Sequence, residues 1–190
     1  MTTITRRGAL LIGGALPMSL ALPTTAQTAP AAPEKPAFAG RAHTIRLGDV
    51  KVSTLLGGTG SNPNPIKTFG LNADPAEFEA LSAQNFIPAD RTGGSYTPTL
   101  LRAGDAVVLF DAGMQAANTL ASLAEAGVQP GDVTHVVLTH MHGDHIGGVP
   151  ELLARWPSLP VFAPDDPRIP LDCNRVRDGD PVSLAGWSFE

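Results

Sequence analysis

The segment 136–148 constrains the fold more than any other part of the chain, because it joins a short apolar run to a dense set of metal-type ligands. Val136-Val137-Leu138 is a β-branched, apolar run that is typical of a buried strand. It leads directly into Thr139-His140-Met141-His142-Gly143-Asp144-His145-Ile146-Gly147-Gly148. Three of the chain's five histidines and one carboxylate therefore follow the end of a single predicted strand. The two glycines that close the motif allow another segment to approach closely behind it.

Neutral imidazoles and a carboxylate are ligands that zinc and similar divalent cations take. In an extended backbone, His140 and His142 point to the same side and could bind one ion together. A turn at Gly143, followed by a helix that begins near Asp144, would direct Asp144 and His145 towards a neighbouring point. This spacing predicts two metal ions about 3.5–4 Å apart. The alternative is a solvated loop that happens to be rich in histidine.

These residues also resemble a known family. The pattern His140-x-His142-x-Asp144-His145 at the end of an apolar strand, with Val107-Val108-Leu109-Phe110-Asp111-Ala112-Gly113 ahead of it, is similar to the signature of the metallo-β-lactamase superfamily. The resemblance covers residues 43–190 and implies that His140 and His142 bind the first metal, and Asp144 and His145 the second. It further implies two divalent cations, with zinc favoured and iron or manganese left open. Asp111 would be a supporting carboxylate that orients one of the metal ligands. The alternative is that Asp111 only caps the turn after a strand.

The other elements predict strands and helices that alternate along the chain. Hairpins are expected at 44–47 with 50–55 and at 97–101 with 106–110, and further strands at 160–162 and 182–184. Helices are expected from Asp74, at 119–126 and at 151–155, with a loop at 57–65. Such a pattern gives an α/β or α+β class. The resemblance narrows it to an αββα sandwich.

The sequence of the first residues predicts an export signal rather than a part of the folded domain. Arg6-Arg7 precedes an apolar run at 9–22, and small residues follow before position 27. Residues 1–26 are therefore expected to be a signal peptide of the twin-arginine type, with a general secretory signal as the alternative. Residues 27–42, rich in alanine and proline, are expected to be a disordered linker. We thus expect a periplasmic or secreted protein that engages the twin-arginine export machinery and has no stable membrane anchor.

Composition limits the remaining partners. A net charge of −5 gives no basic surface for nucleic acid, so a small-molecule substrate is expected. The single cysteine, Cys173, excludes an internal disulfide and is expected to be a small buried side chain. His43 and His135 are expected to be a surface residue and a packing residue rather than ligands. Nothing in the sequence determines an oligomeric state.

The end of the chain departs from the family pattern. The resemblance implies a third histidine for the first metal, a bridging aspartate and a final histidine for the second metal, all downstream of the motif. No histidine follows His145 in the printed sequence. Residues 176–190 resemble the strand pair that leads into that missing segment. We therefore expect the chain to be the N-terminal portion of such a domain, incomplete at its C-terminus.

The chemistry expected of this site is hydrolysis by metal-activated water, with Asp144 as a general base. Residues 85–98 resemble exported esterase, lactonase and organophosphate-hydrolase members, so an ester, lactone or phosphotriester substrate is expected. The alternatives are a β-lactam hydrolase, or an inactive fragment with an incomplete metal site; thioester hydrolysis is disfavoured outside the cytoplasm. Phe69, Phe86 and Tyr96 either line an apolar substrate entrance or serve as core and loop anchors.

Overall fold

The computed structural model describes residues 38–184 and 186–189, and the predicted signal segment 1–26 and residues 27–37 lie outside them. The strands are β1 (Ala42–Leu47), β2 (Val50–Leu55), β3 (Gly58–Asn62), β4 (Thr92–Tyr96), β5 (Thr99–Ala103), β6 (Ala106–Phe110), β7 (His135–Val137), β8 (Val161–Pro164), β9 (Asn174–Val176), β10 (Val182–Leu184) and β11 (Trp187–Phe189). The α-helices are α1 (Ile66–Phe69), α2 (Pro75–Gln84), α3 (Ala116–Glu125), α4 (Gly143–Ile146) and α5 (Val149–Arg155).

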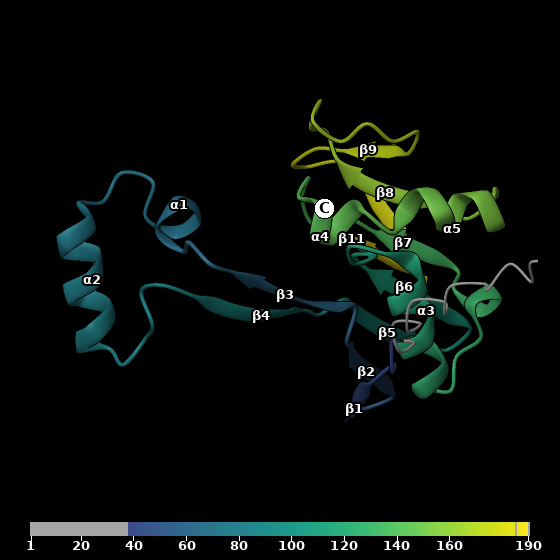
Figure 1. Cartoon of the computed structure of the whole chain (residues 1–190). Helices are drawn as coiled ribbons and strands as arrows, with labels where there is room; N and C mark the ends of the chain where they lie inside the picture. The colour runs from purple at the N-terminus through teal and green to yellow at the C-terminus, as the bar shows by residue number, and fades with distance from the viewer. Residues whose placement is uncertain (1–37, 185, 190) are drawn as a thin grey trace, which may run out of the picture. The chain divides into compact units, whose positions relative to one another are not determined.

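One mixed sheet of seven strands organises the domain, in the order β1-β2-β5-β6-β7-β8-β9 (Figure 1). The strands from β1 to β6 pair antiparallel, which confirms both predicted hairpins. From β6 to β9 the pairing is parallel. Parallel neighbours need a crossover connection, and here α3 joins β6 to β7 while α4 and α5 join β7 to β8. The carboxyl ends of β6 and β7 therefore lie side by side, and both predicted site segments begin there.

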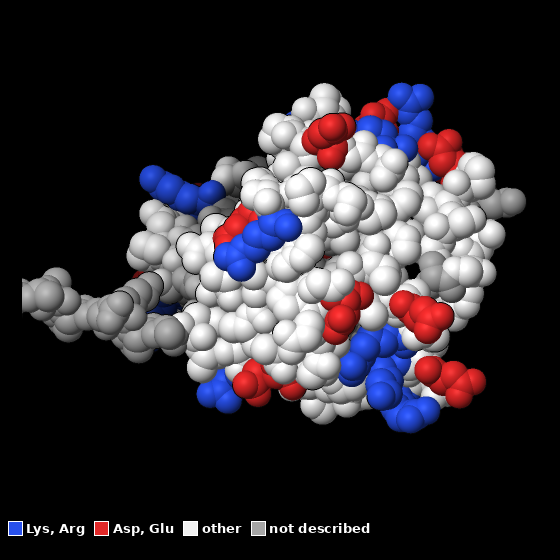
Figure 2. Space-filling model, turned by 90° about the vertical axis from the view of Figure 1, so that its right-hand side faces the viewer, with Lys and Arg blue, Asp and Glu red and all other residues white. Residues whose placement is uncertain are grey.

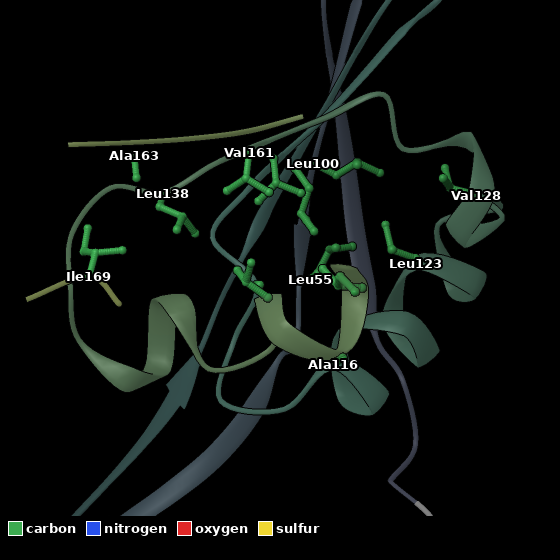
Figure 3. Close-up of a cluster of buried hydrophobic side chains, with 14 residues drawn as sticks. Leu55, Leu100, Ala116, Leu123, Val128, Leu138, Val161, Ala163 and Ile169 are labelled. Carbon is green, nitrogen blue, oxygen red and sulfur yellow. The ribbon is translucent and has the colours of Figure 1, made fainter. Parts of the chain in front are cut away.

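The main core covers one face of this sheet (Figure 3). Its centre is a row of side chains that face one another across four strands, namely Leu100, Leu109, Val136 and Val161. The helices α3 and α5 contribute Leu123 and Leu152 to the same cluster. The apolar run of β7 is therefore buried, as the sequence predicted. This buried strand anchors the start of the histidine motif.

The second face of the sheet carries the hairpin β10–β11. Ser183 and Gly186 of this hairpin line a hollow together with Ala106 and His135 of the main sheet. Val108, which points to this face, is buried. The mixed α/β class is thus confirmed, with helices on one face of the large sheet and the beginning of a second strand layer on the other.

Three boundaries predicted from the sequence are wrong. The expected loop at 57–65 contains β3, which pairs with β4 as a separate two-stranded ribbon that leads to α1 and α2 (Figure 1). Its glycine- and serine-rich sequence lacks the alternation that marks a strand, so only pairing reveals it. The helices α3 and α5 begin earlier than expected, at Ala116 and Val149.

The domain also begins earlier than residue 43. The Arg41 N–H donates to Ser122 Oγ on α3, and the Arg41 carbonyl accepts from Leu56 N. Ala42 is the first residue of β1. The end of the predicted linker is therefore part of the folded unit, because its backbone is bonded to α3 and to the end of β2.

The described surface mixes charges of both signs. On the face in Figure 2, lysine and arginine side chains lie among aspartate and glutamate side chains, with uncharged residues between them. None of the helices within residues 38–184 and 186–189 has the length and apolar character needed to span a bilayer.

The different burial of two leucines predicts that replacing each by alanine lowers the free energy of unfolding by a different amount. Leu109 is fully buried in β6, whereas Leu47 at the end of β1 is 62% exposed. Leu109→Ala should lower the free energy of unfolding by about 2–5 kcal/mol, because it removes packed methyl groups and leaves a cavity. Leu47→Ala, the matched control, should cost less than about 0.5 kcal/mol. Urea unfolding followed by circular dichroism measures the free energy of unfolding of both variants. Equal losses in the two would contradict the burial of Leu109 in the core.

Candidate metal centre

The site is built on an unusual backbone at the end of β6. Asp111 has a φ of 62°, a left-handed conformation that non-glycine residues rarely adopt. Backbone bonds hold it there: Asp111 N donates to the Val137 carbonyl, and Ala112 N donates to the His145 carbonyl. The side chain of Asp111, only 14% exposed, is thereby turned towards the segment that follows β7.

Thr139 connects Asp111 to the histidines. Its backbone N–H donates to Asp111 Oδ1 at 2.9 Å, and its hydroxyl lies 2.9 Å from Asp111 Oδ2. An ionised carboxylate only accepts, so the single hydroxyl proton of Thr139 goes to Asp111. The oxygen lone pairs of Thr139 then remain as acceptors for the neighbouring rings.

These bonds determine which ring nitrogen of two histidines is free. His145 Nδ1 lies 2.8 Å from Asp111 Oδ2, so Nδ1 carries the proton and Nε2 keeps its lone pair. His140 Nδ1 lies 3.1 Å from Thr139 Oγ1, which has no second proton to give, so His140 also donates from Nδ1. In the neutral form, both rings therefore carry their proton on Nδ1 and leave Nε2 to bind a metal ion.

The Nε2 atoms of these two rings lie close to further candidate metal-ligand atoms. His140 Nε2 is 3.1 Å from His142 Nδ1, and His145 Nε2 is 3.3 Å from Asp144 Oδ2. Two ligands on one tetrahedral zinc lie about 3.3 Å apart when each bond is about 2.0–2.1 Å long. Each pair thus has the separation of two ligands on one ion. The rings of His140 and His145 lie 3.7 Å apart between centroids, so the two pairs are adjacent.

The donor set fits two half-sites rather than a complete site. Among the described residues, no group of three or more histidine, cysteine, aspartate or glutamate side chains is arranged around one point to hold a metal ion. Zinc sites normally take three or four protein ligands, so each pair needs further donors. The structure brings together all four predicted ligands and Asp111, as two pairs and a supporting carboxylate.

Close backbone contacts explain the glycines of the motif. A Cβ at Gly147 would lie 2.5 Å from the Met114 carbonyl, and one at Gly148 would overlap the Ala112 carbonyl. The close approach predicted behind the motif is therefore confirmed. Gly143, expected to provide a special turn, instead starts α4 without a left-handed φ.

A groove of about 630 Å³ opens beside the motif. It is lined by His142 and Asp144, by the ribbon β3–β4 with Tyr96, and by Phe69 and Met114. Two of the three aromatic residues proposed for a substrate entrance thus line the same groove as the candidate ligands. Phe86 does not, and it is 96% exposed at the end of α2.

The other candidate residues lie outside the site. His135 Nδ1 bonds Thr134 Oγ1 at the start of β7, and His43 lies on β1. Cys173 packs against the core at the far edge of the sheet, where burial raises the pKa of its thiol. Sequence reasoning missed Thr139, Met114 and the ribbon β3–β4. The position of Thr139 directly before the first histidine was the available signal for the first of these.

The comparisons with known proteins match the part of the chain that carries these residues. A family model described as the metallo-β-lactamase superfamily matches residues 91–180. Residues 91–180 therefore belong to that superfamily. A hydroxyacylglutathione hydrolase of Xylella fastidiosa (strain M23) is 42% identical over 103 residues, which are 54% of this chain and 38% of that protein. One from Stenotrophomonas maltophilia (strain R551-3) is 43% identical over 95 residues, 50% of this chain and 35% of that protein. The chain thus spans well under half the length of these relatives.

Solved structures show the same fold. AidC, a dizinc quorum-quenching lactonase in complex with a product, matches with a TM-score of 0.58 and 27% identity, over 66% of this chain and 45% of that one. The hydrolase AbOPH of the beta lactamase superfamily matches with a TM-score of 0.53 and 24% identity, over 67% of this chain and 45% of that one. The second match supports the fold alone.

The Asp111 carboxylate predicts a measurable effect on metal affinity. Asp111→Asn removes an acceptor that keeps the His145 proton on Nδ1, so zinc affinity should fall about 10–100-fold. Competition with a chromophoric chelator measures the affinity of the full chain. Asp105→Asn, in the β5–β6 turn, is the matched control and should leave the zinc affinity unchanged. An unaltered affinity in Asp111→Asn, with the fold intact by circular dichroism, would show that this carboxylate does not orient a ligand.

Proposed function

We propose that this chain is part of a metal-dependent hydrolase that acts on an ester, lactone or phosphotriester. The observation that carries the proposal is the spacing of the candidate ligand atoms, 3.1 Å between His140 Nε2 and His142 Nδ1 and 3.3 Å between His145 Nε2 and Asp144 Oδ2. His140 and His142 would hold one divalent cation, and Asp144 and His145 a second. A bound cation supplies a Lewis acid and lowers the pKa of bound water towards 7. The similarity to AidC, a lactonase with 27% sequence identity to this chain, supports the substrate class.

The chain's own residues have distinct tasks in this proposal. Asp111 and Thr139 accept from Nδ1 of the two rings that they contact, which orients Nε2 of each ring towards a bound cation. Asp144 lines the groove, and its carboxylate would serve as the general base for the nucleophilic water. Substrate enters along the groove between the ribbon β3–β4 and α4. The buried strand β7 anchors the motif, which keeps the ligand pairs in place.

A thioester hydrolase is the second candidate. Its support is the 42% identity to a hydroxyacylglutathione hydrolase over 54% of this chain, which is higher than the 27% identity to the lactonase over 66% of this chain. A β-lactam hydrolase and an inactive fragment are the other outcomes that the following experiment distinguishes.

The hydrolase proposal predicts zinc-dependent turnover of a neutral ester. The full chain, dialysed against chelator and reloaded with zinc, should hydrolyse p-nitrophenyl acetate faster than the metal-free chain. His140→Ala combined with His142→Ala should reduce the rate to the metal-free level, whereas His43→Ala should not. Faster turnover of S-lactoylglutathione would favour the thioesterase, and faster turnover of nitrocefin the lactamase. No retained zinc and no turnover of any of the three would identify an inactive fragment.

We further propose that the protein is exported through the twin-arginine pathway to the periplasm or beyond. The support is the sequence Arg6-Arg7 ahead of an apolar run. Replacing both arginines by lysine should retain the protein in the cytoplasmic fraction of a Gram-negative host, as measured by immunoblotting. Lys35→Arg is the control, because it exchanges one basic residue for another outside the arginine pair. This variant should still be exported. Export of the double variant in a strain without the twin-arginine translocase would contradict this route.

A further inference from the structure

The ribbon β3–β4 presents one face to the groove beside the motif. Residues that oppose each other across the ribbon, such as Gly58 with Tyr96 and Gly60 with Gly94, have side-chain positions on the same face of the ribbon. Gly60, Gly94 and Tyr96 all line the groove. Tyr96 has the only aromatic side chain on this face of the ribbon, which it shares with Asn62, Thr92 and three glycines.

Gly60 makes room for the Tyr96 hydroxyl. A Cβ added at Gly60 would overlap Tyr96 Oη, with the ring carbon Cζ 3.1 Å away. The phenol therefore lies along the ribbon over Gly60, in space that any other residue at that position would fill. Two positions that are 36 residues apart thus place one hydroxyl at the groove.

This hydroxyl is available for a ligand. Within the part of the chain that the structure describes, no group hydrogen-bonds Tyr96 Oη. By contrast, the Asn62 side chain is already engaged, as its Nδ2 donates to Thr68 Oγ1 and its Oδ1 accepts from Asn64 N. A phenol with a free donor at a partly buried site gains most from a carbonyl acceptor.

The groove has no cationic lining among the described residues. Its charged groups are the Asp144 carboxylate and, when protonated, the His142 ring, while Phe69 and Met114 supply apolar surface. Away from the metal-ligand pairs, a carboxylate on the ligand would find no lysine or arginine to pair with along this lining. This lining favours an uncharged ligand with an apolar chain over the dicarboxylate glutathione moiety.

We propose that Tyr96, held in place by the absence of a side chain at Gly60, donates a hydrogen bond to the carbonyl oxygen of an uncharged ester or lactone substrate whose apolar chain contacts Phe69 and Met114. The inference rests on the proposed hydrolase function and specifies its substrate. Tyr96 is a substrate-orienting residue, which turns the scissile carbonyl towards the metal-ligand pairs.

Tyr96 is the chain's only tyrosine, so it gives a single spectroscopic signal. The full chain carrying ¹³Cζ-labelled tyrosine, loaded with zinc, is titrated with hexanamide, a neutral carbonyl compound that resists hydrolysis. The Cζ resonance should move saturably with hexanamide and remain in place with glutathione at equal concentration. In Gly60→Ala this response should be lost, while Ser95→Ala, which alters the opposite face of the ribbon, should retain it.

A second readout tests the hydroxyl itself. The Met114 methyl resonance, assigned with Met114→Leu, reports hexanamide binding in Tyr96→Phe, and the apparent Kd should rise about threefold to tenfold. No Cζ response in the unaltered chain, an equal response to glutathione, or an unchanged Kd in Tyr96→Phe would each overturn the inference. Because the titration needs no turnover, an inactive chain that shows the response would contradict only the hydrolase proposal.

Discussion

The candidate site depends on one carboxylate, Asp111, that the fold holds in a left-handed conformation at the end of β6. Its two oxygens accept from Thr139 and His145, residues that follow the neighbouring parallel strand. The consequence extends beyond the direct contacts, because the Thr139 hydroxyl proton is committed to Asp111 and the His140 ring must then donate to Thr139. One carboxylate therefore determines the tautomer of two candidate ligands. Its strained backbone persists because bonds to Val137 and His145 hold it from both sides.

The sheet explains why this carboxylate and the histidines meet. Parallel pairing of β6 with β7 places the carboxyl ends of both strands at one edge, and the buried row of leucine and valine side chains fixes their register. The short helix α4 then turns Asp144 and His145 back towards Asp111. Glycines 147 and 148 permit this return, since side chains there would collide with the loop after β6.

Much of this arrangement could be predicted from the sequence because it is local. The apolar run before His140 and the glycines after His145 indicate strand, turn and helix within one short segment. The bond between Asp111 and His145 joins residues 34 positions apart, and spacing alone cannot indicate such a contact; it was expected only from the family resemblance. The ribbon β3–β4 could not be predicted, because its glycine and serine residues carry no periodic apolar pattern and its stability comes from pairing. The resemblance led to the correct superfamily, while the substrate and the export route remain proposals.

The central claim, that His140, His142 and His145 direct ring nitrogens to divalent cations, is tested most directly by side-chain nitrogen NMR of the full chain. The chain has five histidines, so His43 and His135 serve as internal controls. Before zinc is added, His140 and His145 should show a protonated Nδ1 and a bare Nε2. On titration with zinc, the Nε2 signals of these two rings and the Nδ1 signal of His142 should shift, while His43 and His135 remain unchanged. Equal shifts in all five rings, or the opposite tautomer at His145, would contradict the account.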